Sequence, residues 1–63
     1  MQIDKIIFRY DEDDEIGNVE YYDRDYRHID THNFDDISYD MFRSMYAYYT
    51  YVSMDIIVQF QQI

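Results

Sequence analysis

Five consecutive acids at residues 11–15 form the densest group of potential metal ligands in the sequence. Carboxylates bind calcium, but an EF-hand loop also needs glycine at its sixth position and glutamate at its twelfth. Counted from Asp11, those positions hold Ile16 and Tyr22, and a count from Asp13 fails in the same way. The run therefore predicts a solvated acidic loop, with weak and nonspecific cation binding as the alternative.

Two histidines, His28 and His32, are the other candidate ligands. A spacing of four would bring their imidazoles together on a helix, but we expect this stretch to be a connection. No third ligand is evident, and a structural metal site normally has four. We therefore expect no metal and no cofactor.

Catalytic chemistry finds no support in the residue pattern. The 63 residues contain one glycine, so there is no phosphate-cradling loop, and no nucleophile motif is present. Carboxylate pairs used in acid–base catalysis need a pocket that perturbs them, and so short a chain can hardly enclose one. The sequence predicts a protein that is not an enzyme.

Acids and tyrosines are interleaved over residues 20–26, where we predict the second strand of a hairpin. Side chains two apart on a strand share a face at about 6.6 Å, and nucleotides rise about 3.4 Å along a DNA strand. Asp23 and Asp25 could thus imitate phosphates, although an ordinary solvent-facing strand is the alternative. The candidate partner-binding residues here are Glu20, Tyr21, Tyr22, Asp23, Asp25 and Tyr26.

A helix that begins near Tyr39 and ends near Tyr51 would supply an aromatic anchor. Ser38 is a suitable N-cap, and Asp40 complements the helix dipole. Four apolar residues fall at i, i+3, i+4 and i+7, which makes one stripe. They either contact a partner or pack on the sheet as core: Phe42, Met45, Tyr46 and Tyr49.

The remaining elements follow from alternation and turn signals. Residues 3–10 alternate as a half-buried strand, Gly17 and Asn18 mark a turn, and residues 54–60 form a last apolar strand. The expected fold is one α+β domain over residues 1–63. It has a three-stranded antiparallel sheet with one helix packed across it, in the order strand-strand-helix-strand.

The net charge limits the kinds of partner that this chain can bind. Fourteen acids against five bases give a net charge of −9, while 48% of the residues are hydrophobic and 21% aromatic. Such a chain repels nucleic acid and anionic membranes and attracts basic surfaces, and its apolar content predicts a folded protein. Without cysteine or an N-terminal signal pattern, we expect a cytoplasmic protein. A domain this small gains from self-association, so we expect a homodimer.

With these features the sequence resembles the small acidic uracil-DNA glycosylase inhibitors of Bacillus podoviruses, over residues 4–63. The resemblance lies in Tyr21-Tyr22-Asp23, in Phe42 and Tyr46 four apart at the helix start, and in Asp55-Ile56-Ile57 before the last strand. It departs from the family in a longer hairpin loop, in arginines among the strand acids, and in the tyrosines after the helix start.

The resemblance implies a dimeric DNA mimic that blocks the DNA-binding face of a bacterial uracil-DNA glycosylase. Asp23 (or Asp25) would stand in for phosphate, and Phe42 and Tyr46 would line an apolar pocket at the dimer. One alternative is a DNA mimic directed at a CRISPR nuclease, a restriction enzyme or a nucleoid protein. Another is a small structural or adapter subunit.

Overall fold

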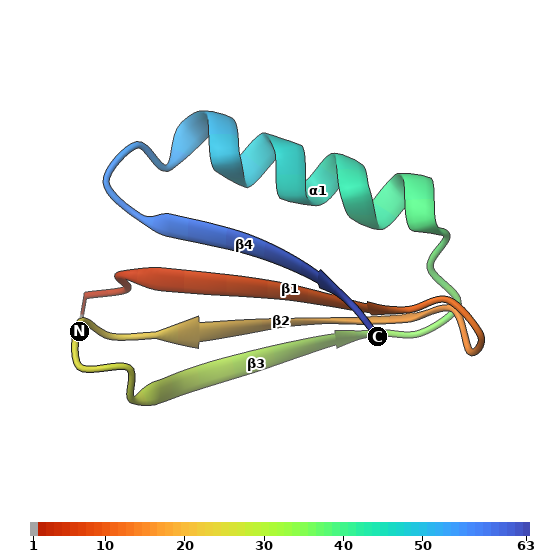
Figure 1. The fold of residues 1–63 in the computed structure, drawn as a ribbon, viewed down its shortest axis with the longest axis horizontal. Coiled ribbons are helices and arrows are strands. Elements are labelled where there is room, and N and C mark those ends of the chain that lie inside the picture. The colour runs from red at the N-terminus through yellow and green to blue at the C-terminus, as the bar shows by residue number, and fades with distance from the viewer. Residues whose placement is uncertain (1) are drawn as a thin grey trace.

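A computed structural model describes residues 2–63, which form one helix over one side of a sheet (Figure 1). The strands lie in the order β3-β2-β1-β4. β1 pairs antiparallel with β2 and parallel with β4, and β2 pairs antiparallel with β3. Along the chain the elements are β1 (Lys5–Asp11), β2 (Ile16–Tyr22), β3 (His28–Phe34), α1 (Tyr39–Val52) and β4 (Ile57–Gln62).

The α+β class with one helix is confirmed, but the expected three-stranded antiparallel sheet is wrong. The expected connection contains β3, which holds few apolar residues and is ordered by its backbone pairing with β2. The helix returns the chain to the end of the sheet where β1 starts, so β4 runs parallel to β1. The sheet is therefore four-stranded and mixed.

The helix matches its sequence signals closely. Ser38 is the N-cap, and its hydroxyl accepts a hydrogen bond from the backbone N–H of Met41 at 3.2 Å. Asp40 lies in the first turn, where the positive end of the helix dipole favours a carboxylate. The helix ends at Val52, one residue beyond the predicted end.

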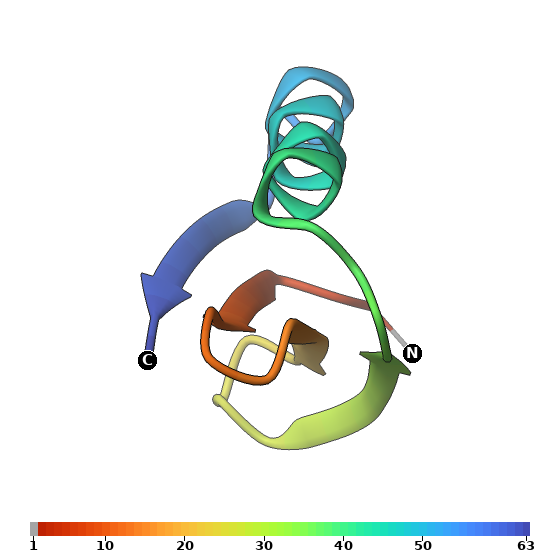
Figure 2. The ribbon, with the colours of Figure 1, turned by 90° about the vertical axis from the view of Figure 1, so that its right-hand side faces the viewer.

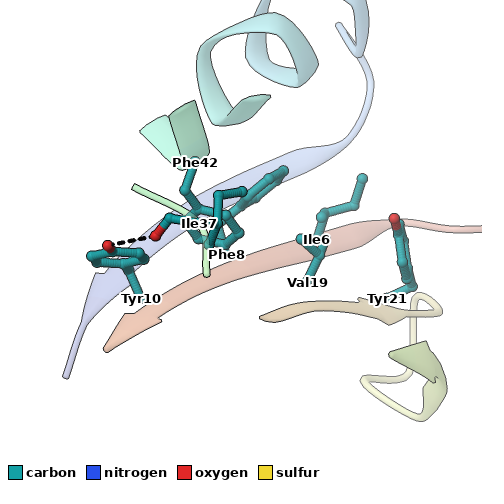
Figure 3. Packing of buried hydrophobic residues seen from close by; sticks show 7 residues of the cluster. All are labelled: Ile6, Phe8, Tyr10, Val19, Tyr21, Ile37 and Phe42. Carbon is teal, nitrogen blue, oxygen red and sulfur yellow. Dashed lines mark hydrogen bonds between the residues drawn. The ribbon is translucent and has the colours of Figure 1, made fainter. Parts of the chain in front are cut away.

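The core lies between α1 and the near face of the sheet (Figure 3). Alternate residues of β1 supply Ile6, Phe8 and Tyr10, which confirms the predicted face of the first strand. Phe42 has no exposed surface, and its ring lies 5.4 Å from that of Phe8. The other buried members of the cluster are Val19, Tyr21 and Ile37.

Gly17 on β2 makes room for the Phe42 ring. A Cβ atom at position 17 would lie 2.6 Å from the nearest ring carbon, well inside van der Waals contact. The ring is fully buried, so it has little freedom to move away.

We expect Gly17→Ala to lower the free energy of unfolding by about 1–3 kcal/mol through overpacking. Urea denaturation measures the change. In a Phe42→Leu background the same substitution should be less destabilising, because the smaller side chain relieves the contact. An equal loss in both backgrounds would show that the ring is not the cause.

Candidate functional site

The strand predicted over residues 20–26 ends earlier than expected. β2 stops at Tyr22, and residues 23–27 form a turn. Asp23 organises this turn: its Oδ1 accepts hydrogen bonds from the backbone N–H groups of Asp25, at 2.9 Å, and Arg27, at 3.0 Å. Tyr26 completes the turn with a positive φ of 61°. The expectation that Asp23 and Asp25 share a strand face is wrong, because an aspartate side chain stabilises a turn there instead.

The other candidates on this segment point in different directions. Glu20 forms an ion pair with Arg9 on the far face of the sheet, away from α1. Tyr21 faces the helix and is buried, whereas Tyr22 lies on the far face against the ring of His28. Tyr26 is 63% exposed in the turn. The structure therefore does not bring this segment together as one contact surface.

The aromatic stripe of the helix packs on the sheet. The rings of Tyr46 and Tyr49 lie 5.7 and 5.6 Å from that of Phe8. Met45, like these two tyrosines, is partly buried against the core. Because Phe42 is fully buried, it has no surface with which to contact a partner in this conformation.

Eight of the fourteen acids gather instead at one end of the molecule, which we call the acidic end. This end combines the β1–β2 turn with the connection from β3 into α1 (Figure 1). The backbone N–H of Ile37 donates to the carbonyl of Glu15 at 3.0 Å, so the two segments are in direct contact. Neither segment contains lysine or arginine. The acidic end consists of Asp11, Glu12, Asp13, Asp14, Glu15, Asp35, Asp36 and Asp40.

Hydrogen bonds hold the acidic end in shape. Asp11 Oδ1 accepts the backbone N–H groups of Asp13 and Asp14 at 3.1 and 3.4 Å. Glu12 accepts from the Gln62 amide at 2.9 Å, which ties the turn to β4. These contacts fix the backbone that carries the carboxylates, so the negative charges are preorganised.

Tyr10 connects the acidic end to the core, and its pKa responds to the negative charge there. Its hydroxyl donates to the carbonyl of Ile37 at 2.8 Å. Burial raises the pKa of Tyr10, and the carboxylates of Glu15, Glu12 and Asp11 raise it further. A core hydroxyl thus experiences the negative potential of these acids.

The opposite end of the sheet carries both signs of charge. Lys5 lies over the Tyr26 ring, 4.8 Å from its centroid, and Arg24 Nε is 3.7 Å from Asp4 Oδ2. A shallow hollow of about 340 Å³ opens there. Because its acids are matched by nearby cations, this end offers much less net charge than the acidic end. The residues that line it are Asp4, Lys5, Asp23, Arg24, Tyr26, Asp55 and Ile57.

The acidic end can act as an anion array. Within residues 2–63 no cluster of three or more histidine or acidic side chains has the geometry to hold a metal ion. Closely spaced exposed carboxylates repel one another and attract a basic surface.

In the described part of the chain no helix is long and apolar enough to cross a membrane.

Sequence reasoning misses this site because it misses β3. The residue pattern predicts a solvated loop for residues 11–15 and gives no role to Asp35, Asp36 or Asp40 as partner contacts. Once β3 pairs with β2, the end of β3 must lie beside the β1–β2 turn, since Gly17 pairs with Phe34. The sequence gives little signal for this strand, because His28–Phe34 does not alternate and Ile29 is its only aliphatic residue.

Tyr21 should make the free energy of unfolding depend on pH in the alkaline range. Its hydroxyl lies 3.3 Å from His32 Nδ1, and burial, with added effects of Tyr49 and Asp30, raises its pKa to about 12. The folded state therefore favours the protonated phenol. Its contribution is fully present below about pH 10, the ordinary tyrosine pKa, and is lost as the pH rises toward 12.

We expect the free energy of unfolding to fall between pH 10 and about 12, and to fall less steeply in Tyr21→Phe. Urea denaturation across this range measures the slope. Tyr51→Phe, which changes an exposed tyrosine, is the matched control. A slope equally reduced in both variants would contradict a specific contribution of Tyr21.

Comparison with protein-family models, with curated proteins and with solved structures found no match to this chain. The resemblance to uracil-DNA glycosylase inhibitors thus stays a prediction from the sequence. The acidic end and its surroundings are therefore the structural basis for inferring a function.

Proposed function

We propose that this protein binds the basic groove of a DNA-binding protein through its acidic end and thereby excludes DNA. The observation that carries the proposal is the convergence of eight carboxylates, without a lysine or arginine in either segment, at one end of a small fold. Proteins that bind DNA neutralise phosphates with lysine and arginine, so an anion array of this kind is complementary to their grooves.

Apolar side chains beside the acids provide contacts beyond charge. Met41, in the first turn of α1, is 61% exposed. Tyr39 at the helix start and Ile16 at the start of β2 are also partly exposed. Charge gives fast association, whereas affinity in protein interfaces is concentrated in a few buried anchors. These three side chains replace the buried Phe42 as the proposed anchors.

Uracil-DNA glycosylase is the proposed target, on the strength of the sequence resemblance. The test is uracil excision by a bacterial enzyme while this protein is titrated against it. Stoichiometric inhibition, with a complex that excludes DNA, would support the target. Absence of inhibition at large excess of folded protein would discard it, and CRISPR nucleases, restriction enzymes and nucleoid proteins would be tested next.

Neutralising the acidic end should weaken partner binding far more than neutralising acids elsewhere. The triple variant Glu12→Gln, Asp13→Asn, Asp14→Asn removes three exposed charges from the acidic end. We expect a loss of affinity of roughly tenfold or more at low salt, since close charge pairs in interfaces couple by at least about 1.5 kcal/mol. Titration calorimetry measures it.

The matched control removes three exposed acids outside the acidic end: Asp25→Asn, Asp30→Asn and Asp55→Asn. It should bind nearly as well as the unmodified protein, and the contrast should shrink at high salt because charge is screened. Equal losses in the two variants would show that only total charge matters. Binding that ignores both salt and acids would favour the adapter alternative.

A further inference from the structure

β4 is an edge strand whose outer side pairs with no other element in residues 2–63. It is the last strand in the order β3-β2-β1-β4, and Figure 2 shows it at one side of the sheet while α1 lies over the sheet face. The outer backbone groups of such a strand are a template for another strand.

Hydrogen bonding shows which residues of β4 face outward. The N–H of Ile57 donates to the carbonyl of Asp4 at 3.1 Å, and that of Ile63 donates to Tyr10 at 2.9 Å. In a parallel ladder alternate residues bond the same neighbour, so the odd-numbered residues of this strand point their backbone groups at β1. The backbone groups of Val58, Phe60 and Gln62 consequently point away from the sheet.

Charge distinguishes β4 from the rest of the molecule. Residues 56–63 contain no charged side chain, in a chain of net charge −9. At the other edge, β3 carries Asp30 and two histidines, and its pairing with β2 is interrupted by a bulge at Ile29, the extra residue between His28 and Asp30. Bulges and charges are features that protect an edge from further pairing, and β4 has neither.

We propose that β4 pairs with β4 of a second copy of this chain, which makes one continuous eight-stranded sheet. A two-fold axis through the sheet reverses the strand direction, so the two strands are antiparallel. The register centred on Phe60 is the one in which all three outward-facing residues have a partner. Phe60 then faces Phe60 of the second copy, and Val58 faces Gln62.

The same register pairs the exposed side chains of β4 with one another. Ile57 comes opposite Ile63 of the second copy. In the single chain Ile57 is 53% exposed and Ile63 is 76% exposed. Gln59 comes opposite Gln61, and cross-strand pairs of like character stabilise a sheet. β1 runs parallel to β4, so the antiparallel arrangement places the two acidic ends at opposite ends of the dimer. The two most negative regions are thus kept apart.

Hydrogen exchange followed by NMR tests the interface in the unmodified protein, and it does not depend on the proposed function. At concentrations where the mass is twice the 7.9 kDa of one chain, the amides of Val58, Phe60 and Gln62 should be protected. Dilution to the monomer should expose these three while Gln59 and Gln61, bonded to β1, stay protected. A monomer at every concentration, or no dilution effect on the three amides, would overturn the proposal.

Two substitutions test the register. Ile57→Lys and Ile63→Glu should each raise the dimer dissociation constant roughly tenfold, because each removes two apolar pairs. The double variant places lysine opposite glutamate twice and should recover most of the affinity. Tyr48→Lys, on the exposed side of α1, is the control and should dimerise normally. Singles that dimerise like the control, or a double weaker than both singles, would contradict the register.

Discussion

One aromatic ring joins the helix to every strand of the sheet. Phe42 lies against Phe8 and Tyr10 on β1, at centroid distances of 5.4 and 5.6 Å. It also lies against Phe34 on β3, at 6.3 Å, and Phe60 on β4, at 5.9 Å, and it covers Gly17 on β2. Tyr46 and Tyr49 add contacts between the layers, but Phe42 is the fully buried helix residue, and a core this small depends strongly on it. Truncation to alanine would remove about 3–5 kcal/mol, which is a large share of the stability that such a domain has.

The position of this ring explains why the acids converge. Phe42 is in the first turn and a half of α1, so the helix start is held at the end of the sheet where the β1–β2 turn lies. Tyr10 then fastens the connection by its hydrogen bond to Ile37. The acids are not needed for these contacts, which are made by aromatic rings and backbone groups. The core thus determines where the acidic end lies, and apart from Asp11 and Glu12, which accept hydrogen bonds, its carboxylates are left free for solvent or a partner.

Local signals in the sequence are sufficient where one residue type decides the conformation. The alternation of β1, the Ser38 cap and the helix stripe each predict what the structure contains. The predicted strand position of Asp23 is wrong because an aspartate within a strand-like run can instead accept hydrogen bonds from backbone N–H groups in a turn. β3 escapes prediction because its stability comes from backbone pairing with β2, and its own side chains give little sign of a strand. The parallel placement of β4 likewise depends on the helix direction, which no local pattern encodes.

A concentration of eight like charges opposes folding, and its location limits that effect. Most of these carboxylates are exposed, where water screens their mutual repulsion. The amino-terminal end of α1 adds a partial positive charge beside them, which stabilises Asp40 in particular. The apolar surface available to offset the remaining repulsion is small in a single chain. In the proposed antiparallel pair the uncharged β4 edge lies far from the acids of the second copy, so pairing would add hydrogen bonds and isoleucine contacts without bringing the negative regions together. The division of this chain into a charged end and a neutral edge would therefore let two copies associate despite the net charge of −9 on each.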